Sequence, residues 1–145
     1  HEEREQYGAA LENAPAMAVL ADGSHLRQAW DRRVLFTPGW TDVPAMQRGV
    51  IQMMLAGEAH GYGHRAAFAH DISKPMAQIT QPGMILTNTG DDIYYAAARA
   101  RDIRPDFDYV ELTGGTHDIV DEQPGAWCEV VAEFVVRHAD RVPAP

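Results

Sequence analysis

The spacing of apolar residues predicts a helix near the start of the chain. Leu26, Trp30 and Val34 recur at the interval that places side chains on one face of a helix. Ser24 follows a turn-forming Asp-Gly pair, and a serine in that position is typical of an N-cap. The charged, alanine-rich segment 2–13 is also predicted to be helical.

Further helices are predicted before the pattern changes. The second begins at Thr41 or Asp42, with Pro44 in its first turn, and continues through an apolar stretch. The glycine-rich sequence "GEAHGYGH", residues 57–64, is expected to interrupt the helical region. Two short helices are expected after it, around residues 65–70 and 72–79.

The second half of the chain has the pattern of alternating strands and helices. The apolar runs 82–89 and 107–112 are bounded by proline, glycine or threonine-glycine and are predicted to be strands. Between them, residues 94–103 are predicted to be a helix, and Pro124 begins the last one. The apolar face of that last helix is Trp127, Val130, Val131, Phe134 and Val135. This order predicts two neighbouring parallel strands joined by a right-handed crossover.

Chemistry-bearing residues follow each predicted strand. The first strand is followed by "TGDDIY" and the second by "TGGTHD", and loops at the carboxyl ends of parallel strands share one sheet edge. Asp91 and His117 are therefore expected to face each other, with His117 as a general base that the carboxylate orients. Asp92 is the rival acid. The alternative is that either aspartate caps the following helix and that His117 is an ordinary loop histidine.

Two segments carry a resemblance to a known family, "QITQPGMILTNTGDDIY" and "FDYVELTGGTHDIVDEQPGAWCEVVAEFV". They resemble the C-terminal part of an α/β-hydrolase, where a proline precedes the penultimate strand, an aspartate follows it, and the catalytic histidine follows the last strand. The resemblance implies Asp91 as the acid and His117 as the base, with Asp92 one position late. It also implies hydrolysis of a small ester, amide or related bond.

The resemblance implies a fold class as well. Residues 1–74, which include "DGSHLRQAW" and "AFAHD", resemble the helical lid of such enzymes, and residues 75–145 resemble the end of their core. The expected fold is a partial α/β-hydrolase, in which a helical lid is followed by a strand-helix-strand-helix unit with two parallel strands.

The family's nucleophile motif, Gly-x-Ser-x-Gly, is absent from the sequence. The only serines are Ser24, in a turn, and Ser73, ahead of the first strand. The chain therefore resembles a C-terminal fragment that carries the acid and the histidine of a triad, and we expect it to be inactive alone. The alternative is a non-catalytic binding module built on the same half-fold.

The net charge and the cysteine content exclude several classes of binding partner and covalent cross-link. A net charge of −9 argues against binding to nucleic acid or to an anionic membrane, and no apolar run approaches membrane-spanning length. The single cysteine, Cys128, excludes an internal disulfide. We expect a small-molecule substrate, no nucleic-acid or membrane partner and, without a signal-peptide pattern, a cytoplasmic location.

No cofactor and no metal are expected. His60, His64 and His70 invite a metal site, but the glycines around them argue against a stable helix and no nearby carboxylate completes the ligands. Cys128 is expected to be a small core residue of the last helix. Trp40, which follows "TPG", is the aromatic residue expected to contact substrate.

A homo-oligomer is expected as well. The strand 83–89 would lack the neighbour that precedes it in a larger sheet, so its outer edge would present unpaired backbone groups. The expected assembly is a two-fold dimer, joined through that edge, through the lid helices or by exchange of an element.

Overall fold

The computed structural model describes residues 18–139, apart from the side chain of Glu58. The chain divides into two compact units, residues 1–71 and residues 72–145. The predicted helix at 2–13 lies outside the described residues. Among residues 18–139, no helix has the length and apolar character needed to cross a bilayer.

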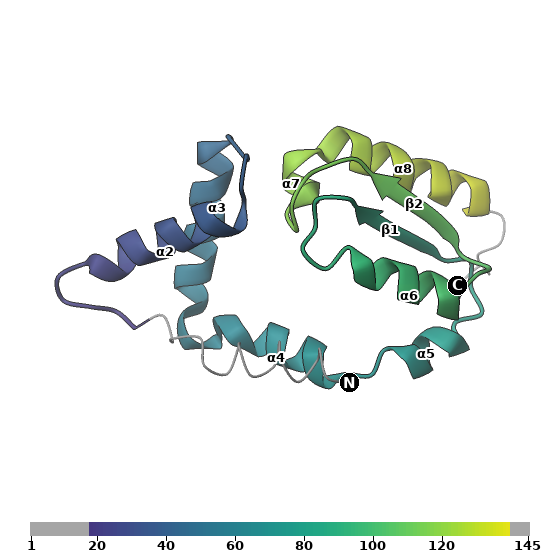
Figure 1. Cartoon of the computed structure of the whole chain (residues 1–145), viewed down its shortest axis with the longest axis horizontal. Helices are drawn as coiled ribbons and strands as arrows, with labels where there is room; N and C mark the ends of the chain where they lie inside the picture. The colour runs from purple at the N-terminus through teal and green to yellow at the C-terminus, as the bar shows by residue number, and fades with distance from the viewer. Residues whose placement is uncertain (1–17, 140–145) are drawn as a thin grey trace. The chain divides into compact units, whose positions relative to one another are not determined.

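The described part of the first unit is helical (Figure 1). Its elements are α2 (Ser24–Phe36), α3 (Val43–Ala56), the 3-10 helix η1 (Gly57–Gly61) and α4 (Tyr62–Ala69).

The start of α2 differs from the prediction in its cap. Gly23 occupies the N-cap position with φ 73°, a left-handed conformation that suits glycine. The Asp22 carboxylate accepts from the backbone N–H of Ser24 at 3.0 Å and from its hydroxyl at 2.9 Å. The residue that organises this helix start is therefore Asp22, and Ser24 is the first residue of the helix. For α3 the choice left open by the sequence falls on Asp42, whose carboxylate accepts from the Ala45 N–H at 3.0 Å.

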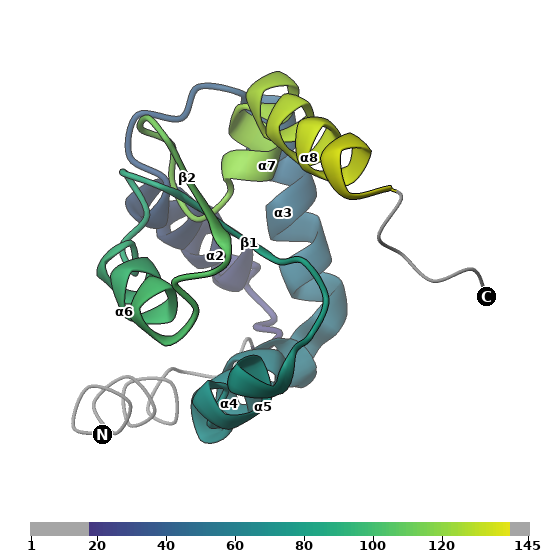
Figure 2. The same cartoon turned by 90° about the vertical axis from the view of Figure 1, so that its right-hand side faces the viewer.

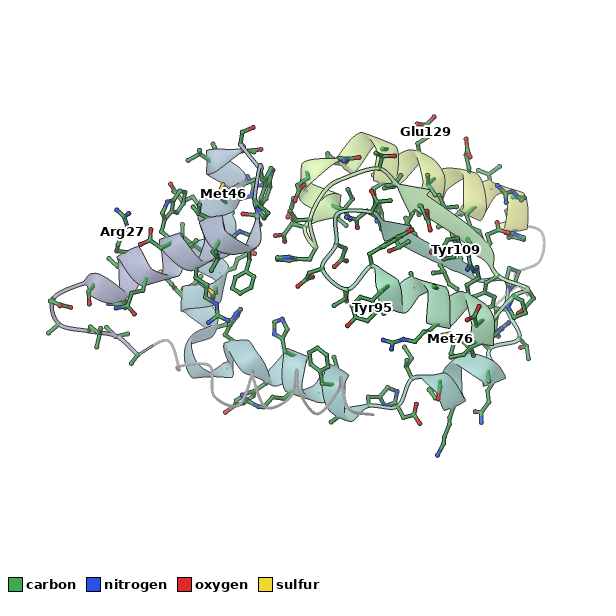
Figure 3. The ribbon with its side chains drawn as sticks, in the orientation of Figure 1. Arg27, Met46, Met76, Tyr95, Tyr109 and Glu129 are labelled. Atoms are coloured by element: carbon green, nitrogen blue, oxygen red, sulfur yellow. The ribbon has the colours of Figure 1, made fainter. Side chains whose placement is uncertain are left out.

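The predicted apolar face of α2 is wrong. Leu26 and Val34 are 50% and 47% exposed, whereas Ala29 is buried. A small residue lets two helices approach closely, so the face that packs in this unit is the one that carries Ala29. The buried apolar side chains of the described residues are Ala29, Ala45, Met46 and Val50, of which Met46 is labelled in Figure 3.

The predicted interruption at residues 57–64 is confirmed only at its start. The helix α3 ends at Ala56, where Gly57 leaves the helical region, and η1 then leads into α4. Only Gly57 uses glycine's conformational freedom, with φ 54°, while Gly61 has φ −79° and Gly63 lies inside α4. Glycine costs about 1 kcal/mol in a helix relative to alanine but does not forbid one, so two of the three glycines are helical.

The second unit is a mixed α/β structure. Its elements are α5 (Ser73–Gln78), β1 (Met84–Asn88), α6 (Tyr95–Ile103), β2 (Asp108–Leu112), α7 (Ile119–Glu122) and α8 (Pro124–His138). Within the described residues, β1 and β2 form a two-stranded parallel sheet, in register from Met84 beside Asp108 to Asn88 beside Leu112. The predicted parallel pairing is confirmed. Figures 1 and 2 show α6 and α8 on opposite faces of this sheet.

The last two helices agree with the sequence only in part. Trp127, Val130, Val131 and Phe134 are half-buried on α8, but Val135 is 58% exposed. Glu129 points away from the sheet (Figure 3). Cys128 is exposed and is not the core residue expected. The short helix α7 has no counterpart in the predicted elements.

Candidate functional site

The two loops that follow the strands lie against each other at the carboxyl edge of the sheet. We call residues 89–92 the aspartate loop and residues 113–118 the histidine loop. The Thr89 N–H donates to the Leu112 carbonyl at 3.0 Å, and the Gly90 N–H donates to the Gly114 carbonyl at 3.2 Å. The Gly114 N–H donates back to the Thr89 hydroxyl at 2.8 Å. The expectation that both loops share one edge is confirmed.

Asn88, the last residue of β1, connects the end of this strand to the histidine loop. Its side chain amide donates to the carbonyls of Gly114 and Thr116, both at 3.0 Å. Asn88 is 2% exposed, so these two bonds satisfy a polar group that would be costly to bury alone. Sequence reasoning missed this residue. The sequence feature that could have identified it is a side-chain amide at the end of an apolar strand, one residue before the aspartate loop.

Glycines allow the two loops to approach this closely. A side chain carbon on Gly90 would overlap the carbonyl oxygen of Gly115. Gly114 and Gly115 have φ values of 73° and 70°, which other residues rarely adopt. These consecutive left-handed residues turn the chain so that Thr116 points inward and His117 follows at the surface.

A second clamp fixes the far side of the histidine loop. The Glu122 carboxylate accepts from the Thr116 N–H, with both oxygens at 3.1 Å, and also from the Thr116 hydroxyl. The same hydroxyl oxygen accepts from the Asp118 N–H at 3.2 Å. Gln123 adds a bond from its amide to the Thr113 carbonyl at 3.0 Å. Glu122 thus holds the residue that precedes His117.

His117 is partly open to solvent and has a carboxylate beside its ring. Its Nε2 lies 3.2 Å from Oδ2 of Asp118, with side-chain exposures of 41% and 21%. The sequence analysis did not identify Asp118 as this neighbour. A residue that directly follows His117 in the chain can reach its ring only because of the local turn found here. His117 makes no hydrogen bond to Asp91 within the described residues.

Asp91 is half-buried and begins a turn. Its Oδ1 accepts from the Ile93 N–H at 3.0 Å. Partial burial raises the pKa of Asp91, and the neighbouring Asp92 carboxyl raises it further, while the Ile93 N–H and the charge of His117 lower it. His117 is therefore close enough to interact with Asp91 electrostatically. Asp92, the rival acid, is exposed.

Trp40 belongs to the first unit. It is half-buried, and the Arg33 guanidinium lies over its ring at 5.1 Å from the centroid. An arginine on an aromatic face is a favourable contact in itself. A role for Trp40 in substrate contact stays a prediction.

The two serines occupy helix starts. Ser24 is the first residue of α2 and Ser73 the first residue of α5. Neither stands on a turn that follows a strand of the described sheet, which is where an α/β-hydrolase nucleophile would be placed.

Comparison with known proteins changes the functional interpretation of the chain. No family model matches the chain. A 43-residue stretch is 46% identical to the 2,3-bisphosphoglycerate-dependent phosphoglycerate mutase of Chlamydia abortus. The matched stretch covers 30% of this chain and spans 18% of the length of that protein.

This match contradicts the resemblance to an α/β-hydrolase and, with it, the predicted hydrolysis through a Ser-His-Asp triad. The physical reason is that the quoted segments reflect a general arrangement. An aspartate after one parallel strand and a glycine-flanked histidine after the next will mark the carboxyl edge of many open α/β sheets. Short motifs of this kind have many false positives.

Proposed function

We propose that the chain is part of an enzyme that transfers a phosphoryl group on a small phosphorylated acid. The observation that carries this proposal is the 46% identity over 43 residues with a phosphoglycerate mutase. The histidine loop is the proposed place of proton transfer, because it presents a half-exposed imidazole beside a carboxylate.

His117 is the proposed general acid–base group. The carboxylate of Asp118 beside Nε2 would favour one ring orientation. The other ring nitrogen would then exchange the proton with the reacting oxygen. In phosphoryl transfer, His117 would take the proton of the attacking hydroxyl and later return it to the leaving oxygen.

Asp91 is the proposed second acid–base group. Burial and the adjacent Asp92 carboxyl raise its pKa, which brings proton exchange closer to neutral pH. Asp92 has the same chemistry but a more exposed position. Asp91 is the better candidate because it is half-buried, and this burial is the main cause of its raised pKa.

The charge of this edge limits what it can bind. The Asp118 carboxylate lies beside the imidazole and Asp91 lies in the facing loop, and both carboxylates would repel an anionic phosphate. We therefore assign to the histidine loop the proton transfer at the reacting oxygens, and we expect groups outside this loop to neutralise the charge of the phosphoryl group.

The test combines turnover with binding. The full chain would be assayed for conversion of phosphoglycerate in the presence of 2,3-bisphosphoglycerate, and imidazole signals would be followed by NMR during titration with phosphoglycerate. His117→Asn should abolish turnover, whereas His70→Asn, a change at an exposed histidine of the first unit, should leave it unchanged. Full activity of His117→Asn would overturn the assignment of the site. If the chain shows no turnover and phosphoglycerate also leaves the His117 signals unshifted, the proposed function is overturned.

A further inference from the structure

We propose that His60 and His64 form a two-ligand binding site for a divalent transition metal ion of the zinc, nickel or copper type. The pair lies in the first unit and takes no part in the function proposed above.

The backbone supplies the spacing that the sequence left in doubt. Residues 57–61 form η1 and residues 62–69 form α4, with Gly61 and Tyr62 both in the right-handed helical region at the junction. His60 and His64 are thus about one helical turn apart on a continuous helical backbone. Side chains at this separation lie on the same face of a helix. A helical H-x-x-x-H pair is a recognised arrangement of zinc-ligating histidines.

The two rings already lie close together. Their centroids are 5.8 Å apart, with an interplanar angle of 62°. With Zn–N bonds of about 2.1 Å, two rings that share one tetrahedral ion have centres about 5 Å apart. The remaining difference is less than about 1 Å and is within reach of a small rotation of either side chain.

A positive charge lies near the pair. Arg32 of α2 acts electrostatically on His60 and would repel a bound cation, which weakens the site. Its guanidinium is directed over the Phe36 ring, 5.6 Å from the centroid.

The number of ligands sets the kind of site. Among the residues described, no group of three or more histidine, cysteine, aspartate or glutamate side chains could hold a metal ion. The protein would supply two nitrogens and water the other positions, which makes an open site weaker than a four-ligand structural site. Imidazole ligands favour copper, nickel and zinc and disfavour magnesium and calcium, which prefer oxygen.

The test is a titration of the full chain with zinc at pH 7.5, measured by calorimetry, with magnesium as the control ion. His60→Ala and His64→Ala should each weaken zinc binding about tenfold or more. His70→Ala is the matched control, because His70 follows α4 outside this pair, and it should bind zinc like the original chain. Equal zinc affinity of all three variants would overturn the site.

A second measurement does not depend on the folding of the variants. Zinc added to the original chain should shift the imidazole NMR signals of His60 and His64 together, and nickel should broaden them. Lowering the pH to about 5.5, below the ordinary histidine pKa of about 6.5, should release the metal. Signals of His60 and His64 that stay unchanged on addition of zinc would overturn the proposal.

Discussion

Asn88 carries both hydrogen bonds that hold the histidine loop to the end of β1. Its amide is buried, and the two carbonyls that it reaches lie on either side of Gly115. Alanine at this position would leave both carbonyls without this donor and would open a small cavity. We expect Asn88→Ala to lower the free energy of unfolding by about 1–3 kcal/mol.

Urea unfolding measures this loss. Gln81→Ala, at an exposed position before the same strand, is the control and should change stability by less than about 0.5 kcal/mol. A loss for Asn88→Ala as small as that of the control would mean that water replaces the amide.

Glu122 holds the same loop from the other side. Glu122→Ala would leave the Thr116 N–H and hydroxyl without their acceptor, and we expect a loss of about 1–3 kcal/mol in the free energy of unfolding. Glu122→Gln retains one acceptor oxygen and should lose less. Glu129→Ala, on the side of α8 that faces away from the sheet, is the matched control (Figure 3). Equal stability of the Glu122 and Glu129 variants would contradict the clamp.

The raised pKa of Asp91 has a consequence for the pH dependence of stability. The folded chain holds this proton more tightly than the unfolded chain, in which the pKa is about 3.9. Stability therefore falls as the pH rises from the unfolded pKa through the folded pKa, and the penalty persists at neutral pH. Asp91→Asn keeps the acceptor oxygen for Ile93 but cannot ionise. We expect this variant to be more stable than the original chain at pH 7.

Denaturant unfolding at several pH values from 3.5 to 7 tests this expectation. The stabilisation by Asp91→Asn should grow with pH over that window and then level off. Asp102→Asn, at an exposed position of α6, is the control. An Asp91→Asn variant that is less stable than the original chain at pH 7 would show that the ionised carboxylate is favourable in the fold.

At the scale of the elements, substitution of glycine by alanine should change the stability of the chain in opposite directions at two positions with different surroundings. Gly63 lies inside α4 with no atom close enough to meet an added methyl group. Gly63→Ala should stabilise the chain by about 0.5–1 kcal/mol, because alanine has the higher helix propensity. Gly90→Ala forces the loops apart and should destabilise by about 1–3 kcal/mol. Thermal unfolding of the two variants checks both signs.

The elements of the second unit were the easier part to predict from sequence. The strands over 84–88 and 108–112 are apolar runs with clear breaks at both ends, and their connection through one helix required parallel pairing. The passage from η1 into α4 was missed, because glycine at positions 61 and 63 permits a helical conformation without indicating it. The face of α2 was missed because the packing residue is Ala29, which periodicity of large side chains does not reveal.

For the candidate site, the sequence predicted only that its two loops lie at the same edge of the sheet. Parallel strands dictate that Asp91 and His117 lie at one edge, and this much follows from connectivity. Asp118 beside the ring and Glu122 under Thr116 depend on the turn that Gly114 and Gly115 create. That turn is set by backbone angles, which the sequence permits but does not specify.

At the scale of the whole molecule, exposed apolar groups favour association. Among the described residues, the sheet has two strands and therefore two edges with unpaired backbone groups. Leu35, Leu55 and Val136 are 73%, 83% and 77% exposed. We predict a homo-oligomer at micromolar concentration, and a tendency to associate that increases with salt, because salt screens the repulsion from a net charge of −9.

Sedimentation velocity at two salt concentrations tests this prediction. The expected result is a species larger than the 16.0 kDa chain. A Leu55→Glu variant distinguishes the surfaces, since it should weaken association through helices and leave association through strand edges intact. A 16.0 kDa species at both salt concentrations would contradict the prediction.

The close approach of Gly90 to Gly115 also limits which amino acids can replace the glycines of these two loops without loss of the fold. In a library that varies each position in turn, position 90 should accept only glycine, because even one methyl group would overlap backbone. Position 115 has φ 70°, and a side chain there would have to displace the end of the Ile119 side chain. Position 114 has φ 73° and only an ordinary contact with Gln123 Nε2 at 4.0 Å, so asparagine and aspartate should survive there. Mutational tolerance should therefore be lowest at position 90.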